Sequence, residues 1–383
     1  MKHLSRRHFL EKMGAAASLL MVSPQATALA GTGAPSFEML VVGDSHISGQ
    51  GLSPENKFYS LVKNWIQTEV FGDSLPVNLK VKAHSGSRIE LHKDELESMQ
   101  KLGDDINKFH HPEANLSQPS IFTQMHGAQK EYADPAKVDL VMLSGGITDV
   151  MVANTVNPFI KESKLLGLIH DYCNKGLFDL LETGTDLFPN AVFVVVGYFP
   201  IISTQSDVDK ISRYFLKAVK FPHPLHAVFT NGISKQFIKV IRKKMALRSR
   251  IWVRESNREM RHAIEKINAG LASPRVLFVE SPISEQTCFG TKNSLLWGTD
   301  NDNFPSDERY SERRKICPEV FKELKHRHYG KMAVRMCEMA AVGHPNVEGA
   351  KAFAEAIKNN LRPILDSMLG AKALKKKLAI RAV

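Results

Sequence analysis

Five short runs of apolar and β-branched residues are spaced along most of the chain. They are Phe37–Gly43, Val77–His84, Val138–Ser144, Ala191–Gly197 and Arg275–Glu280. Four of these runs are almost continuously apolar, which is typical of strands that are buried on both faces of a parallel sheet. The pattern therefore predicts five strands whose two faces are both covered.

Segments with helical periodicity separate most of these strands. The first predicted helix has Ser53 as its N-cap and Pro54 in its first turn, which is the usual order at a helix start. The predicted helices cover approximately residues 53–71, 158–182, 207–219, 234–247, 252–269 and 346–369. This alternation of strands and helices predicts an α/β fold with helices on both sides of a parallel sheet.

Two stretches interrupt the alternation. Residues 87–136 are polar, rich in histidine and loop-like, and residues 281–340 carry many charges after Trp297-Gly298. Long insertions of this kind form lids or pocket walls in some proteins and variable surface in others. We therefore expect residues 31–371 to form a single domain with insertions at about 87–136 and 281–340.

The first thirty residues have the features of an export signal. Arg6-Arg7 precedes a short apolar stretch, Met13–Val22, and Ala28-Leu29-Ala30 follows as an A-x-A cleavage site. The apolar stretch is too short to span a bilayer. Residues 1–30 resemble a bacterial twin-arginine (Tat) signal peptide, which implies a periplasmic or secreted protein.

Composition and charge narrow the classes of protein further. The 43% apolar and 24% charged residues are ordinary for a folded domain and exclude disordered and collagen-like chains. The 51 Lys and Arg residues outnumber the 40 Asp and Glu residues. Part of this excess lies in the basic tail, residues 372–383, which is compatible with weak contact with an anionic membrane surface. We expect no nucleic-acid partner, and the oligomeric state stays open.

The chain has four cysteines, and none of them form a C-x-x-C motif. Disulfides are allowed in an oxidising compartment. Four cysteines allow three pairings, of which we favour Cys317–Cys337 because these two flank a polar, histidine-containing segment. We find no motif for a metal or a cofactor, and we expect neither.

Polar and glycine residues follow three of the predicted strands. The strands end in Gly43-Asp44-Ser45-His46, in His84-Ser85-Gly86-Ser87-Arg88 and in Ser144-Gly145-Gly146-Ile147-Thr148-Asp149. In open parallel sheets, ligands bind beyond the carboxyl ends of the strands. The three loops are therefore predicted to meet at one edge of the sheet and to form a site.

A serine hydroxyl at such an edge needs a base to take its proton and donors for the developing oxyanion. Ser45 is the candidate nucleophile, and its own N–H and that of Gly86 are candidate oxyanion donors. Glycine allows a close backbone approach at this position. His344, just before the last predicted helix, is the candidate base.

These blocks resemble the ordered blocks of the SGNH/GDSL hydrolases. The matching segments are Gly43-Asp44-Ser45, the isolated Gly86, Gly146-Ile147-Thr148-Asp149 and His344-Pro345-Asn346. The resemblance implies a flavodoxin-like three-layer α/β/α sandwich with a five-stranded parallel sheet. It also implies ester hydrolysis through an acyl-enzyme on Ser45, as in the secreted lipase and esterase-like members.

Two positions depart from the pattern of that family. Thr148 stands where the family usually has the asparagine that donates to the oxyanion, so the third donor is either Thr148 or another residue such as Asn154. Ala341 stands where the family usually has the acid that orients the histidine. Either the carbonyl of Ala341 takes this role or an acid does, with Asp300, Asp302 and Asp307 as the candidates.

The remaining residues of the predicted site are expected to have supporting rather than catalytic roles. Asp44 and Asp149 are expected to support the loops by binding backbone amides, His46 to line the pocket wall, and Arg88 to be a solvated surface residue. The substrate class is a small-molecule, lipid or glycan ester. The alternative functions are a catalytically impaired binding protein on the same fold and a carbohydrate O-acetylesterase.

Overall fold

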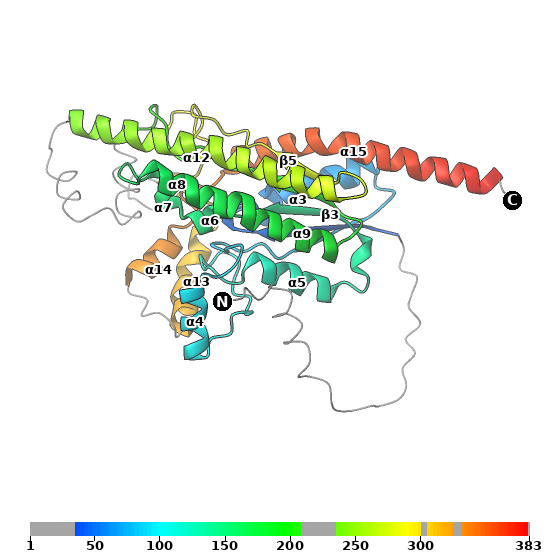
Figure 1. Ribbon diagram of the computed structural model, residues 1–383, viewed down its shortest axis with the longest axis horizontal. Coiled ribbons are helices and arrows are strands. Elements are labelled where there is room, and N and C mark those ends of the chain that lie inside the picture. The colour runs from blue at the N-terminus through cyan, green and yellow to red at the C-terminus, as the bar shows by residue number, and fades with distance from the viewer. Residues whose placement is uncertain (1–34, 208–234, 300–304, 325–330, 382–383) are drawn as a thin grey trace, which may run out of the picture. The chain divides into compact units, whose positions relative to one another are not determined.

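A computed structural model describes residues 35–207, 235–299, 305–324 and 331–381 (Figure 1). The predicted signal peptide and most of the helix predicted over 207–219 lie outside the described residues. Residues Ser36–Val383 form one unit by their contacts. No helix among the described residues has the length and apolar character needed to cross a bilayer.

The five predicted strands form one sheet in which all neighbours are parallel. Its strands are β1 (Phe37–Gly43), β2 (Val77–Val81), β3 (Val138–Ser144), β4 (Val192–Val196) and β5 (Val276–Val279). The strand order is β2-β1-β3-β4-β5, which is the flavodoxin-like order. The α/β fold and the five-stranded parallel sheet are thus confirmed. The order changes direction next to β1, so ligands are expected beyond β1 and β3.

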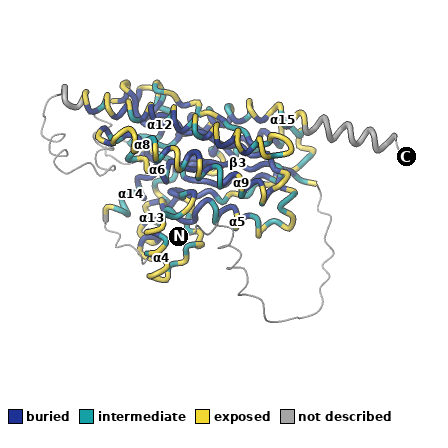
Figure 2. Tube along the Cα trace, in the orientation of Figure 1, coloured by how far each residue is buried: buried dark blue, intermediate teal, exposed yellow. Residues whose placement is uncertain are grey.

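Helices cover both faces of the sheet (Figure 1). On one side α3 (Phe58–Trp65) and α15 (Val347–Arg381) pack against each other. On the other side α5 (Ile121–Glu131), α9 (Leu177–Leu187) and α12 (Lys235–Gly270) form a second layer. The three inner strands β1, β3 and β4 are almost completely buried, whereas the edge strand β2 has two exposed residues and β5 two partly exposed ones (Figure 2). Coverage of both faces is thus confirmed for the three inner strands, and β2 is the exception.

The shorter elements position the loops between these layers. They are α2 (Ser45–Ser48), η3 (Pro135–Lys137), α6 (Ile147–Val150), α7 (Val152–Val156) and α8 (Glu162–Ile169). The helix predicted over 158–182 is α8 and α9 joined by the π-helical turn η4 (His170–Gly176).

Several predicted helix boundaries are wrong. The helix predicted over 53–71 is a 3-10 turn, η1 (Pro54–Asn56), then α3, then the π turn η2 (Ile66–Val70), and the Ser53 side chain caps nothing. The helices predicted over 234–247 and 252–269 are one helix, α12, because residues 248–251 contain neither Pro nor Gly to end it. The last helix continues beyond residue 369 to Arg381.

The two insertions contain helices rather than the loops that we expected for residues 87–136. The first includes α4 (Lys93–Leu102) and α5, and the second includes α13 (Tyr310–Glu323) and α14 (Lys331–Glu338). The helix α4 was not predicted because its composition is mostly polar. It buries only one side, with Glu95 and Met99. The Cys317–Cys337 disulfide, the pairing that we favoured, joins α13 to α14. A small apolar cluster around it includes Ala114 and Leu116, so the two insertions pack on each other.

Candidate active site

Ser45 lies directly beyond the carboxyl end of the central strand β1. Asp44 is the N-cap of the short helix α2, and Ser45 is the first residue of that helix. Every residue from Met39 to Leu52 is buried except Ser45. The fold therefore brings one hydroxyl from a buried turn to the surface.

Asp44 holds this turn against the neighbouring strands. Its carboxylate accepts hydrogen bonds from the His46 amide (3.0 Å), the Ser144 hydroxyl (2.6 Å) and the Tyr198 hydroxyl (2.5 Å). Burial raises the pKa of Asp44, although these hydrogen bonds oppose the shift. Asp44 thus binds three groups of the protein, in line with the expected supporting role.

His344 meets Ser45 across 299 positions of sequence. The Nε2 atom of His344 lies 2.7 Å from the Ser45 hydroxyl oxygen. The histidine backbone is held by Trp297, whose N–H donates to the His344 carbonyl at 2.7 Å and whose carbonyl accepts from Gly343 at 2.9 Å. Asn346 then caps α15, since its Oδ1 accepts the Gly349 amide at 2.9 Å.

In the described part of the chain neither a carboxylate nor a carbonyl forms a hydrogen bond with the other ring nitrogen of His344, Nδ1. Burial lowers the pKa of His344 to about 4, and the Arg313 guanidinium adds to this shift, whereas the carbonyls of Ala341 and Ala340 oppose it. The imidazole is therefore neutral at ordinary pH. A neutral imidazole can accept a proton from a hydroxyl.

One candidate acid is excluded by its contacts. Asp307 pairs with Arg313 through Oδ2 at 2.6 Å, and its Oδ1 accepts the Arg309 amide at 2.9 Å. Both carboxylate oxygens of Asp307 are therefore used away from the histidine. Asp300 and Asp302 lie outside the described residues.

Gly86 has the left-handed backbone conformation that glycine adopts readily, with φ of +79°. A Cβ atom at this position would lie 2.6 Å from the Leu116 carbonyl oxygen and would also meet the Asn115 side chain. Among the hydrogen bonds of the described residues, neither the Gly86 amide nor the Ser45 amide has an acceptor. Two unused N–H groups thus follow the neighbouring strands β1 and β2.

The other predicted site residues follow β3. Thr148 lies in α6 and is partly exposed, and the structure gives its hydroxyl no partner among the described residues. Asn154 uses one amide hydrogen on the Val150 carbonyl at 2.7 Å. Both oxygens of Asp149 accept the Ile89 amide at 3.2 Å, and burial raises the pKa of Asp149 to about 7. Asp149 therefore ties the β3 loop to the segment after Gly86.

Three residues near the site escaped our sequence reasoning. Tyr198 follows β4 and, besides donating to Asp44, accepts the Ile147 amide at 3.3 Å, so it joins the β1 and β3 loops. The position of Tyr198 directly after a predicted strand was the signal in the sequence that could have indicated it. Glu113 and Arg313 lie in the insertions and carry no such signal.

Our interpretation of His46 as a pocket-wall residue needs correction. Its ring is buried among four aromatic rings, with centroid distances of 4.7 to 5.8 Å, and burial lowers its pKa to about 3. These rings belong to Phe58, Tyr198, Phe199 and Phe353. Arg88 is also not a solvated surface residue, because it pairs with the buried Glu95 at 3.2 Å.

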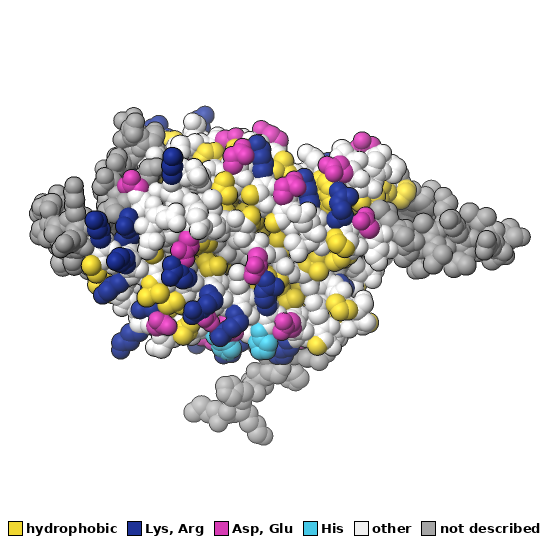
Figure 3. All heavy atoms as spheres, turned by 90° about the horizontal axis from the view of Figure 1, so that it is seen from above, with side chains coloured by type: hydrophobic (Ala, Val, Ile, Leu, Met, Phe, Trp, Pro, Cys, Tyr) yellow, Lys and Arg dark blue, Asp and Glu magenta, His cyan; other side chains and the backbone are white. Residues whose placement is uncertain are grey.

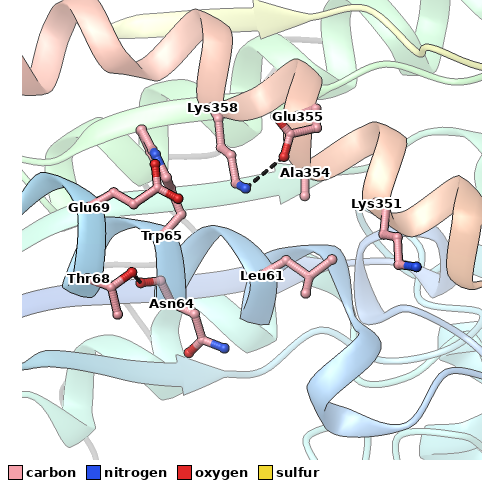
Figure 4. Close-up of a pocket in the computed structure, with 9 residues that line it drawn as sticks. All are labelled: Leu61, Asn64, Trp65, Thr68, Glu69, Lys351, Ala354, Glu355 and Lys358. Carbon is pink, nitrogen blue, oxygen red and sulfur yellow. Dashed lines mark hydrogen bonds and ion pairs between the residues drawn. The ribbon is translucent and has the colours of Figure 1, made fainter.

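A surface groove lies elsewhere, between α3 and α15 (Figure 4). It contains neither Ser45 nor His344, and an ion pair between Lys358 and Glu355 at 2.7 Å spans part of it. Its lining residues are Leu61, Asn64, Trp65, Thr68, Glu69, Lys351, Ala354, Glu355 and Lys358. None of these residues is a histidine or cysteine, and we assign no chemistry to the groove.

The positive charge of α12 is partly neutralised along the helix. Arg254 and Arg258 pair with Glu255, and Arg261 pairs with Glu280. Figure 3 shows Lys and Arg side chains interspersed with Asp and Glu on the face that it presents. Among the described residues, no group of three or more His, Cys, Asp and Glu side chains is arranged to hold a metal ion.

A serine hydroxyl bonded to a neutral histidine at the carboxyl edge of a doubly wound α/β sheet thus defines the site. The sequence matches no protein-family model, and no curated protein is significantly similar to it. Among solved structures, the extracellular lipase from Streptomyces rimosus matches 85% of this chain and 100% of its own, at 13% identity and a TM-score of 0.41.

Two further solved structures are similar to the same extent. Phospholipase A1 from Streptomyces albidoflavus matches 85% of this chain and 99% of its own, at 11% identity and a TM-score of 0.40. A family two carbohydrate esterase from Clostridium thermocellum matches 91% of this chain and 68% of its own, at 10% identity and a TM-score of 0.40. At such low identities and TM-scores, we derive the chemistry of the site from this chain's own residues.

Proposed function

We propose that this protein is an exported serine hydrolase of the SGNH/GDSL type that cleaves carboxylic esters. The 2.7 Å contact between the Ser45 hydroxyl and His344 Nε2 is the observation that carries the proposal. A neutral imidazole at this distance can take the hydroxyl proton while the oxygen attacks a carbonyl carbon. The lone exposure of Ser45 on a buried turn gives an ester access to that oxygen.

The reaction follows from these positions. Ser45 Oγ bonds to the ester carbon, His344 takes the proton, and the carbonyl oxygen becomes an oxyanion. The free amides of Ser45 and Gly86 donate to this oxyanion, and His344 returns the proton to the departing alcohol. A water molecule, deprotonated by His344, then attacks the acyl carbon. The bond to Ser45 Oγ breaks, His344 returns the proton to Oγ, and the acid leaves.

A third oxyanion donor is assigned to Thr148 rather than to Asn154. Thr148 stands at the position of the usual donor, and its hydroxyl can donate one hydrogen bond. Asn154, whose amide has one hydrogen left after its bond to the Val150 carbonyl, stays the alternative. In the absence of a carboxylate, the carbonyls of Ala341 and Ala340 are the groups that act to raise the pKa of His344, and we assign them this electrostatic effect. Asp44 and Asp149 hold the loops.

Export and substrate class complete the proposal. The twin-arginine pattern in residues 1–30 and the Cys317–Cys337 disulfide both suit a periplasmic or secreted protein. We assign the substrate to lipid, acyl-chain or acetylated-glycan esters, and no cofactor is required for the steps above.

The test uses a fluorophosphonate probe and p-nitrophenyl esters of short and long acyl chains on the purified protein. Ser45→Ala is compared with Ser284→Ala, which removes an exposed hydroxyl elsewhere. We expect labelling and turnover to be lost only in Ser45→Ala, and the chain-length profile to separate acetyl esters from lipid esters. A folded wild-type protein that shows neither labelling nor turnover would refute the proposal and favour the binding-protein alternative.

A further inference from the structure

Four charged side chains are buried together beside the catalytic loops. The side chains of Arg313 and Asp307 are 0% exposed, that of Glu113 is 4% exposed and that of Lys57 is 11% exposed. Two positive and two negative charges make the cluster neutral. Its members come from three separate parts of the chain, namely Lys57, Glu113 and the segment with Asp307 and Arg313, so the cluster connects segments that share no secondary structure.

Arg313 is the centre of this cluster. Its Nη1 donates to Glu113 Oε2 at 3.0 Å, its Nη2 to Asp307 Oδ2 at 2.6 Å, and its Nε to the Glu338 carbonyl at 3.0 Å. The planar guanidinium makes these three contacts in one fixed geometry. Glu338 is the last residue of α14, directly before the turn that leads to His344.

Glu113 makes the connection to the Ser45 turn. Its Oε2 accepts the Gly51 amide at 3.2 Å and the Gln50 side chain at 3.0 Å. The Gln50 amide in turn donates to the Ser45 carbonyl at 3.2 Å. Lys57, which lies 3.8 Å from Glu113, donates to the Ser48 carbonyl at 2.7 Å. Glu113, with Lys57, thereby anchors the C-terminal side of the turn that carries Ser45.

The two catalytic loops also touch beside the cluster. Gly51 packs so closely against Ala341 that a Cβ atom there would collide with the Ala341 side chain and lie 3.0 Å from Asp307 Oδ1. The Ala341 carbonyl accepts the His344 amide at 2.9 Å. A shift of Arg313 or Glu113 would therefore move the Ser45 and His344 loops relative to each other.

We propose that Arg313 and Glu113 are positioning residues that join the Ser45 turn to the His344 loop and keep the catalytic hydrogen bond in register. A buried ion pair is often no more stabilising than apolar residues of the same volume, so stability alone does not explain the cluster. The cluster is explained if the pair fixes the position of the two loops relative to each other. This inference rests on the proposed function for its effect on turnover.

Arg313 has a second, electrostatic effect on the base. Among the described residues, the charged or titratable groups that act on His344 are Arg313 from α13 and His46 from α2, and the carbonyls of Ala340 and Ala341 act from the histidine loop. His46 is neutral at ordinary pH because burial lowers its pKa to about 3. Within the described ranges, the fixed cation that favours neutral His344 is therefore Arg313.

The experiment compares Arg313→Gln, Arg313→Lys and Glu113→Gln with Arg275→Gln as the matched control. Arg275 is a partly buried arginine that donates to the Thr185, Phe188 and Ala191 carbonyls at the amino ends of the strands. Melting temperature, kcat, KM and the pH profile are measured for each variant. The pKa of His344 is followed separately by histidine NMR, with the His344 signals assigned from His344→Asn.

We expect Arg313→Gln to lower kcat by about 10²-fold, the usual effect of a misplacement of about 1 Å, with little change in KM. It should also move the acid limb of the profile and the NMR pKa of His344 to higher values. Arg313→Lys keeps the positive charge but loses the planar guanidinium and its several hydrogen bonds. It should therefore lower kcat without moving the acid limb of the pH profile. Glu113→Gln should lower kcat less than Arg313→Gln, and Arg275→Gln should lower only the melting temperature.

Two results would overturn the inference. One is a folded Arg313→Gln protein with wild-type kcat and an unchanged pKa of His344. The other is a loss of kcat in Arg275→Gln equal to that in the Arg313 and Glu113 variants. Should Arg313→Gln fail to fold, Arg313→Lys and Glu113→Gln decide by the same measurements. If the wild type lacks ester turnover, the proposed function fails, and the NMR titration still tests the coupling between Arg313 and His344.

Discussion

Replacing Gly86 with alanine tests whether the loop after β2 serves the oxyanion. At φ of +79° an alanine is strained by about 1–2 kcal/mol. Its Cβ would also lie 2.6 Å from the carbonyl oxygen and 2.7 Å from the nitrogen of Leu116, well inside normal contact distances. The backbone around Leu116 must therefore move, which strains its 3.0 Å hydrogen bond to the Ser85 carbonyl.

This movement should displace the Gly86 amide from the oxyanion. Loss of one such donor typically lowers kcat by about 10²–10³-fold. Gly103→Ala is the matched control, because Gly103 has a similar φ of +70° and a Cβ there would have nothing within 4 Å. Gly103→Ala should thus carry the same backbone strain and keep full activity.

The assay measures kcat/KM, the rate of fluorophosphonate labelling and the melting temperature of both glycine variants. We expect both to melt at lower temperature than the wild type, and Gly86→Ala alone to lose turnover and labelling. If Gly86→Ala keeps the wild-type kcat/KM, as Gly103→Ala is expected to, the assignment of the Gly86 amide to the oxyanion is refuted.

Three further predictions follow from the site. The acid limb of kcat/KM should lie near pH 4, because activity requires neutral His344 and burial lowers its pKa from 6.5 to about 4; a pH–rate limb at 6.5 would contradict this. Thr148→Ala should lower kcat by up to about 10²-fold and Thr148→Asn should retain or raise it, whereas equal kcat in both would exclude Thr148 as a donor. Reducing the Cys317–Cys337 bridge, which spans 20 residues, should lower the free energy of unfolding by about 3 kcal/mol in urea titrations, and no change would mean that other contacts hold α13 to α14.

The sheet and its active edge were predictable because they depend on local pattern. Strands such as β1 and β3 are apolar on both sides, and that property is visible in any window of seven residues. The rule that ligands bind beyond the carboxyl ends of parallel strands then selected the loops with Ser45, Gly86 and Thr148. His344 was found through its resemblance to a family block rather than through any local pattern.

The helices of the insertions were less predictable. The helix α4 buries only Glu95 and Met99, so its apolar periodicity is too weak to stand out from polar loop. The break between two helices that we placed within α12 was wrong for a related reason. A change in polarity along a helix face does not end the helix when no Pro or Gly follows.

The sequence by itself determined which apolar runs become strands. It also indicated Ser45 as the candidate nucleophile and placed Ala341 where the resemblance implies an acid. Only the tertiary structure decided which charged side chains form ion pairs. Glu113 and Arg313 are 200 residues apart, and each looks like an ordinary surface residue along the chain. Their pairing depends on how two insertions pack around the Cys317–Cys337 bridge. Electrostatic contacts act over a few ångströms in space, so a pattern along the chain does not record them.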